Sequence, residues 1–249
     1  MTETNNSIKY TKDPNNLSKT LVVFLWIFLV VNVLGIITDA STISVYNEIL
    51  NGGTISDQKA NEYDQRETLL GIVWLLSFLV CGVIFLKWIY RANANCKGFG
   101  ANDMKFTPGW SIGWYFIPIM NFFKPFKAME EIWLVSHKGP DKWQIIEDAA
   151  KEHSEKKILN LWWAFWIGSF ILGQQSTRLY NDAEDLDALI KAYYVSIGHY
   201  FWEIILALIA IKLVKSIQGS QNKLTNKTIP ANTFPRAVSY THLTLPTKA

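Results

Sequence analysis

The sequence has little of what disulfide-bonded domains and most enzymes rely on. Only two of its 249 residues are cysteines, Cys81 inside an apolar run and Cys96 just beyond one. This excludes a disulfide framework and predicts two unpaired thiols. No H-E-x-x-H or phosphate-cradling G-x-x-x-x-G-K motif occurs either. The sequence therefore predicts no catalytic residue, no metal site and no cofactor, and an enzyme is the less favoured class.

Charge is also scarce. Charged residues make up 18% of the chain, and the net charge is only +3. No run of Lys and Arg alternates with aromatic residues, as a nucleic-acid groove would require, so no nucleic-acid partner is expected. A polar head of some twenty residues precedes the first apolar run, and no small-residue cleavage pattern follows it. A cleavable signal peptide is therefore not expected.

Apolar residues are instead gathered into four long blocks. A membrane helix needs roughly 20 mostly apolar residues to cross about 30 Å of hydrocarbon. Spans are expected at about 20–38, 69–89, 158–179 and 195–214. The third block is short in apolar length, and the fourth carries His199, Glu203 and Lys212. The sequence predicts an all-α integral membrane protein with four transmembrane helices, against the alternative of a soluble helical bundle.

The loops between these blocks differ in charge. Asp39–Glu67 holds two basic and six acidic residues, and Gln174–Tyr194 is acidic as well. The middle segment, Lys87–Lys157, carries eleven Lys and Arg residues. An excess of Lys and Arg marks the cytoplasmic side. This pattern predicts both termini and the middle segment inside, and the two acidic loops outside.

One apolar run does not fit this scheme. "PGWSIGWYFIPIMNFFKPF", residues 108–126, offers about fifteen residues between its prolines, too few for a helix to cross the membrane. Pro118 should kink or break a helix near Trp114. A single helical stripe is nevertheless predicted for Trp110, Gly113, Trp114, Ile117, Pro118 and Asn121. We expect a re-entrant or interfacial helical hairpin over 108–137, between the second and third spans.

Two helices are expected after the apolar run. Residues 126–137 have an amphipathic pattern typical of a helix lying on the membrane or on the bundle, and Gly139 and Pro140 should end it. A mainly polar helix over about 141–157 then leads into the third span.

The central residues resemble DUF4328, a bacterial membrane family of unknown function. The similarity extends from about the first span to Gln221, although the loop at 139–157 is longer and more charged than the family pattern. The matching positions are Trp88, Arg91 and Asn95; Thr107, Pro108, Gly109, Trp110, Gly113, Trp114, Ile117, Pro118, Asn121 and Pro125; and Trp162 with Trp163. The resemblance implies a multi-span protein of the bacterial cytoplasmic (inner) membrane, and it implies no activity.

The chain then divides into four parts. A polar cytoplasmic head (1–19) precedes a membrane domain (20–221) and a cytoplasmic tail (222–237). The last segment, 238–249, is set aside because "VSYTHLTLPT" resembles a translated sequencing adapter.

Two groups of side chains are candidate sites. Arg91 and Asn95 lie one turn apart near Trp88, where the arginine could hold a lipid phosphate or a carboxylate such as Glu130; simple anchoring at the membrane interface is the alternative. His199 and Glu203 share one face of the fourth span. They predict either a hydrogen-bonded structural pair or a modest proton or cation site.

Three functions are compatible with this pattern. The first is a non-enzymatic membrane protein that binds a partner protein or lipid head groups through its cytoplasm-side hairpin. The second is a small transporter or channel component, with the helix broken at Pro118 lining the pathway. An intramembrane enzyme using His199 and Glu203 is the third. The bilayer is the expected environment, and a protein partner or homo-oligomer is possible.

Overall fold

The computed structural model describes residues 9–141 and 156–226, and every regular element in these ranges is helical. The four long helices are α1 (Asn15–Leu50), α2 (Asp57–Gly98), α6 (Lys157–Asn181) and α7 (Leu186–Thr225). Between α2 and α6 lie α3 (Pro108–Gly113), the 3₁₀ turns η1 (Trp114–Phe116) and η2 (Met120–Phe122), and α4 (Lys124–Lys138). Most of the expected helix at 141–157, most of the tail and the adapter-like segment lie outside the described residues.

Two of the four long helices, α2 and α7, begin at side chains that cap them. Ser56 accepts a hydrogen bond from the backbone N–H of Lys59 at the start of α2, at 3.3 Å. At the start of α7, Asp185 accepts one from the backbone N–H of Ala188 at 2.7 Å. Each cap satisfies an N–H that has no partner within the helix. The two acidic loops are therefore short connections with defined ends.

Three helices, α1, α2 and α7, are long and apolar enough to cross a membrane. At 1.5 Å per residue they measure roughly 54, 63 and 60 Å, about twice the hydrocarbon thickness. The predicted spans are therefore the apolar parts of longer helices, which continue into polar sequence at both ends. Helix α6 also forms where the third span is expected, but it does not belong to this set.

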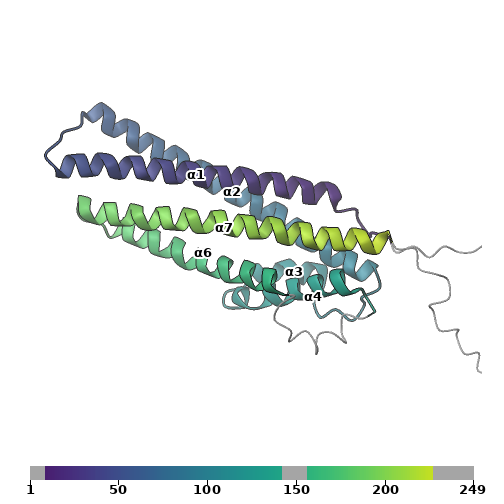
Figure 1. Cartoon of the computed structure of the whole chain (residues 1–249). Coiled ribbons are helices and arrows are strands. Elements are labelled where there is room, and N and C mark those ends of the chain that lie inside the picture. The colour runs from purple at the N-terminus through teal and green to yellow at the C-terminus, as the bar shows by residue number, and fades with distance from the viewer. Residues whose placement is uncertain (1–8, 142–155, 227–249) are drawn as a thin grey trace, which may run out of the picture.

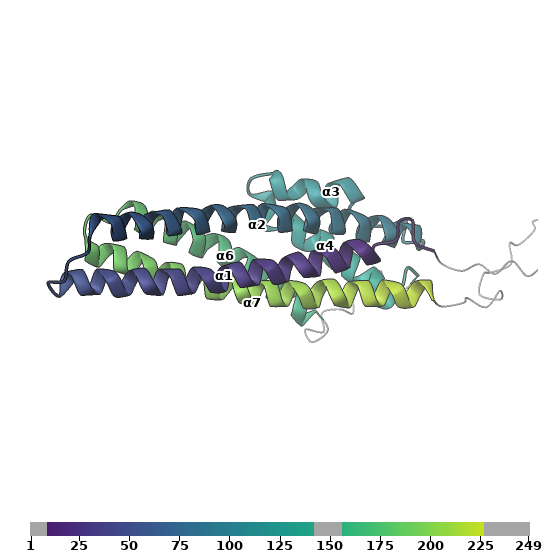
Figure 2. The same ribbon diagram turned by 90° about the horizontal axis from the view of Figure 1, so that it is seen from above.

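The long helices pack in the order α2, α1, α7, α6. Helix α1 packs along both α2 and α7, and α7 packs along α6, whereas α2 and α6 share no extensive contact. Figure 1 shows the α1–α2 and α6–α7 loops at one end of the bundle, and the ends of α1 and α7 that adjoin the grey termini at the other. Figure 2 shows α3 on the outer side of α2, near that second end. The hairpin joins the two helices that do not pack on each other.

Glycines bring α7 close to both of its neighbours, α1 and α6. A Cβ atom added at Gly35 of α1 would lie 2.7 Å from the ring of Tyr200 on α7. One added at Gly168 of α6 would lie 2.4 Å from the ring of Trp202, also on α7. Small residues at such crossings allow the close van der Waals contact that drives helix association in membranes.

Candidate functional site

The residues that resemble the family pattern build the hairpin. Pro108 and Pro125 stand in the first turns of α3 and α4, where the missing proline N–H is not needed. Thr107 caps α3 by accepting a hydrogen bond from the backbone N–H of Trp110 at 3.2 Å. A Cβ atom at Gly113 would lie 3.3 Å from the Trp110 ring, which itself packs 4.8 Å from the Trp114 ring. Gly109 is open on its Cβ side.

The helix breaks at the position that Pro118 predicts. The α-helix ends at Gly113, and η1 continues only to Phe116. A γ-turn follows, in which the N–H of Met120 donates to the carbonyl of Pro118 at 2.7 Å and Ile119 has φ 66°. The single helical stripe from Trp110 to Asn121 is therefore wrong, because only its first turn is α-helical. A positive φ at a β-branched residue costs energy, so the tip is a strained turn.

The tip exposes large apolar side chains. Phe116, Ile119 and Phe123 are 73%, 69% and 63% exposed. The ring of Phe122 packs against that of Phe170, in the middle of α6, with centroids 5.8 Å apart. Phe170 lies about twelve residues, or ~18 Å of helix, beyond Ile158. The tip therefore reaches deep along the apolar part of α6.

Helix α4 is buried more fully than an amphipathic surface helix would be. Its buried residues include the apolar Met129, Ile132 and Val135 and the acidic Glu131. Glu131 accepts hydrogen bonds from the backbone N–H groups of Lys105 and Phe106, at 2.9 and 3.1 Å. The expected position of this helix on the membrane or bundle surface is thus replaced by one inside the bundle end, against α2, α6 and α7.

Trp88, Arg91 and Asn95 lie in the C-terminal part of α2. Trp88 is fully buried in the main core. Arg91 donates to the backbone carbonyl of Asp13 at 3.0 Å, and Asn95 exchanges two hydrogen bonds with the backbone of Lys12. Arg91 and Asn95 therefore fasten the segment before α1 onto α2.

The suggested pairing of Arg91 with Glu130 is wrong. Glu130 instead binds Lys127 at 3.0 Å and Lys156 at 2.7 Å. Burial opposes ionisation of this carboxyl, but the hydrogen bonds from Lys156 and Lys127 outweigh it and hold its pKa below the ordinary value of 4.5. Glu130 therefore ties α4 to the residue that precedes α6.

His199 and Glu203 form the pair that their spacing predicts. His199 Nε2 lies 3.3 Å from Glu203 Oε1, and both side chains are buried. The same carboxylate oxygen accepts a hydrogen bond from Ser169 of α6. A polar cavity of about 330 Å³ adjoins them, lined also by Trp74, Gln174, Ser196 and Tyr200. This geometry fits both alternatives, the structural pair and the proton or cation site.

A second, apolar cavity of about 360 Å³ lies next to the polar one. Glu203 and Phe78 line both cavities. The apolar cavity is bounded by Gly82 of α2, Trp166 of α6 and the hairpin residues Tyr115 and Phe116. The structure therefore brings Glu203 and the hairpin to the same space, beside the gap between α2 and α6. No pattern in the sequence predicts that Glu203 and the hairpin line the same cavity.

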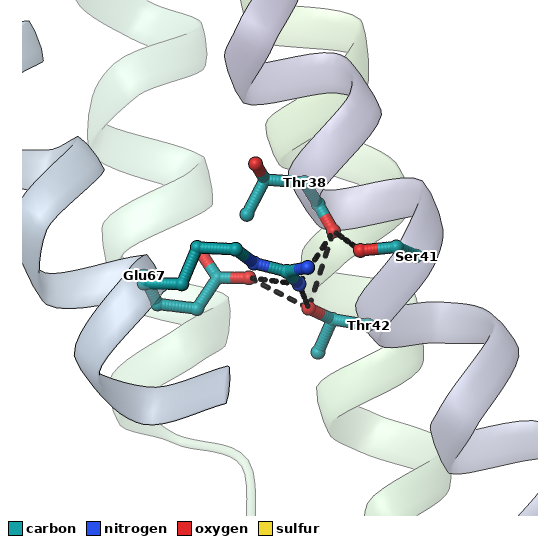
Figure 3. Close-up of polar contacts among 5 residues, drawn as sticks. Thr38, Ser41, Thr42 and Glu67 are labelled. Carbon is teal, nitrogen blue, oxygen red and sulfur yellow. Dashed lines mark hydrogen bonds and ion pairs between the residues drawn. The ribbon is translucent and has the colours of Figure 1, made fainter. Parts of the chain in front are cut away.

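A third polar cluster was not found from the sequence. Figure 3 shows Glu67 of α2 facing Thr38 and Thr42 of α1. Thr42 donates to Glu67 at 2.6 Å and accepts from Arg66 at 3.2 Å. Asp39, one residue beyond the expected first span, is only 2% exposed, and its Oδ2 has no hydrogen-bond partner among the described residues. Its position at the end of an apolar block resembles an ordinary loop start, so no local signal marks it.

Among the described residues, no three His, Cys, Asp or Glu side chains stand close enough to hold a metal ion. The fold is that of an all-helical protein with membrane-type helices and a helical hairpin between α2 and α6. The chain belongs to the DUF4328 family. The family's sequence model, described as "Domain of unknown function (DUF4328)", matches residues 51–219, more than half of the chain. Searches of curated proteins and of solved structures found no match.

Proposed function

We propose that the chain is a non-enzymatic, four-span protein of the bacterial inner membrane that binds a lipid acyl chain beside its re-entrant hairpin. In this arrangement α6 crosses the membrane as the third span, beside α1, α2 and α7, and the termini and the base of the hairpin face the cytoplasm. The charge of the loops supports this orientation, because the Lys- and Arg-rich middle segment contains the hairpin. The contact between Phe122 and Phe170 supports entry of the tip into the hydrocarbon.

The apolar cavity at the hairpin tip is the observation that carries the proposal. Its volume of about 360 Å³ is that of a small ligand pocket. Aromatic and aliphatic side chains surround it, and α2 and α6 do not pack together to close it off. A flexible hydrocarbon chain from the bilayer suits such a space, since it needs no hydrogen bond from the wall. The nearby Glu203 then marks the boundary with the polar cavity.

A cavity-filling substitution tests this binding. Gly82 lines the cavity, and a Cβ atom there meets nothing within 4 Å, so Gly82→Phe fills the space with little strain. Gly71→Phe is the matched control, because Gly71 is on the same helix and is equally open but lies outside the cavity. The full chain in nanodiscs would be photolabelled with a phospholipid carrying a diazirine in its acyl chain. We expect Gly82→Phe to abolish labelling of Tyr115 and Trp166, and Gly71→Phe to retain it. Equal labelling of both variants would refute the proposal.

A transport role is the second candidate, supported by the polar cavity around His199 and Glu203. Single cysteines along residues 110–123 would distinguish it from a packed hairpin. The native thiols do not interfere, since Cys81 and Cys96 are buried and burial raises the pKa of Cys96 to about 12. Labelling by a membrane-impermeant maleimide from the cytoplasmic side would favour transport, and protection would favour the packed hairpin. Labelling from the outside would refute the orientation.

A further inference from the structure

We infer that a cleft between the cytoplasmic ends of α1 and α7 binds the phosphate group of an anionic phospholipid. The inference depends on the proposed membrane orientation and not on acyl-chain binding beside the hairpin. The cleft has a volume of about 450 Å³, and all of its lining residues belong to these two helices. They are Asn15, Ser18, Lys19, Val22 and Val23 of α1, and Val214, Lys215, Gln218, Gly219 and Asn222 of α7.

Two lysines enter this cleft from opposite helices. Lys19 directly precedes the expected first span, and Lys215 directly follows the fourth. Neither ammonium group has an ion-pair or hydrogen-bond partner within the described part of the chain. Two uncompensated positive charges therefore lie at the depth of the head groups, where lysine is attracted to anionic lipid.

A hydrogen-bonded network forms the floor of the cleft. The side-chain oxygen of Asn15 accepts hydrogen bonds from Gln218 at 3.4 Å and from Asn222 at 3.1 Å. Asn222 in turn accepts from Gln218 at 3.0 Å and from the hydroxyl of Tyr10. This network joins α1, α7 and the segment before α1. It therefore fixes the relative position of the two helices that carry the lysines.

The floor presents no negative charge to repel an anion. Burial raises the pKa of Tyr10 to about 12, so its phenol stays neutral at physiological pH. The neighbouring carboxylate of Asp13 is engaged by the backbone N–H of Asn15 at 2.8 Å and does not line the cleft. The remaining floor residues are neutral amides. The electrostatic balance of the cleft is therefore positive.

The apolar wall favours a lipid over a soluble anion. Val22, Val23 and Val214 line the membrane-side part of the cleft, and Val23 is 55% exposed. A phosphate held by Lys19 and Lys215 would direct the acyl chains of its own molecule along these valines. A free phosphate would leave this wall unused.

The test compares charge removal in the cleft with the same charge removal outside it. The full chain would be reconstituted in zwitterionic nanodiscs, and binding of a fluorescent phosphatidylglycerol titrated into them would be measured. We expect Lys19→Gln/Lys215→Gln to weaken binding roughly thirtyfold, as for two lysines near an anionic surface. Lys12→Gln/Lys223→Gln, which removes two exposed charges from the same end without touching the cleft, should leave binding unchanged. Equal loss in both variants would overturn the site.

A steric variant and a competitor complete the test. A Cβ atom at Gly219 meets nothing within 4 Å, so Gly219→Phe fills the cleft without removing charge and should also abolish binding. If the lysine variant fails to fold, Gly219→Phe still tests the site. Unchanged lipid binding by Gly219→Phe would overturn the site. Soluble glycerol phosphate, at the concentration of the lipid, should not displace the lipid probe. Displacement would identify the ligand as a free phosphate and refute the lipid assignment.

Discussion

The carboxylate of Glu131 in α4 holds the backbone N–H of Lys105, 26 residues earlier in the chain, at 2.9 Å. Its second oxygen accepts from the N–H of Phe106 at 3.1 Å. The backbone N–H groups of this loop have no carbonyl acceptor within a helix, and the buried carboxylate of Glu131 accepts their hydrogen bonds instead. This contact sets the position of α3 relative to α4, and with it the opening of the hairpin.

Replacing this carboxylate should loosen the hairpin. Glu131→Gln leaves one acceptor oxygen and turns an NH₂ group toward the second backbone N–H, so we expect a loss of about 1–3 kcal/mol in unfolding free energy. Denaturation in detergent micelles would measure it. Glu184→Gln, at an exposed loop position, is the control and should have almost no effect. A stability equal to that of the unchanged protein would contradict the role assigned to Glu131.

The Glu130 ion pairs should make stability depend on pH. Because the folded pKa of Glu130 is below 4.5, the unfolded chain takes up its proton first as the pH falls. The stabilisation is therefore fully present above pH 4.5 and is lost as the pH falls through the folded pKa. Glu130→Gln should remove this part of the pH dependence and cost about 1–2 kcal/mol at pH 7. Melting curves of both proteins from pH 7 to pH 3 would test it, and parallel curves would exclude it.

Packing of α6 on α7 should depend on Gly168. A methyl group there would meet the Trp202 ring at 2.4 Å, and that ring is held by the hydrogen bond of its N–H to the carbonyl of Phe165, at 2.8 Å. Gly168→Ala should therefore destabilise the protein by about 1–3 kcal/mol through overpacking. Gly71→Ala has open space and should be neutral or slightly stabilising. The same stability for both variants would argue against a close α6–α7 crossing.

The native Asp39 should lower the free energy of unfolding of the protein. Its buried Oδ2 has no partner in the described part of the chain. Glu67 is a second negative charge nearby, and Arg66 is the one positive charge that acts on both carboxylates. Asp39→Asn keeps the shape and the hydrogen bond from Ser196 while removing a desolvated charge, so we expect stabilisation by about 1 kcal/mol at pH 8. Thermal unfolding at that pH gives the answer. A marked destabilisation would show that the charge itself is required.

The positions of the helices follow from the sequence, but their lengths do not. Apolar blocks locate the cores of α1, α2 and α7, and the proline at position 118 locates the break in the hairpin. The polar continuations are helical because of partners that are distant in the chain, such as Glu67 for Thr42. No local pattern reports such partners, so residues 39–50 look like a loop when the sequence is considered alone.

The same limit applies to the candidate sites. The spacing of His199 and Glu203 predicts their pairing because helical geometry fixes it. Ser169, the third member, comes from another helix and carries no sequence signal. In the sequence, Glu131 and Glu130 both belong to the polar face of a helix. In the structure Glu131 is buried under a loop, whereas Glu130 pairs with Lys156. Which of two adjacent acidic residues faces inward depends on tertiary contacts.

The packing order of the helices also constrains how the protein can assemble. The central pair of the bundle, α1 and α7, is made of its first and last helices. During synthesis α1 can pair only with α2 until nearly the whole chain has been made, and Tyr200 cannot reach Gly35 before then. Contacts between such distant segments form late and slowly. Until α7 is made, the face of α1 that it covers has no partner, and a chain truncated before α7 would lack the helix that joins α1 to α6.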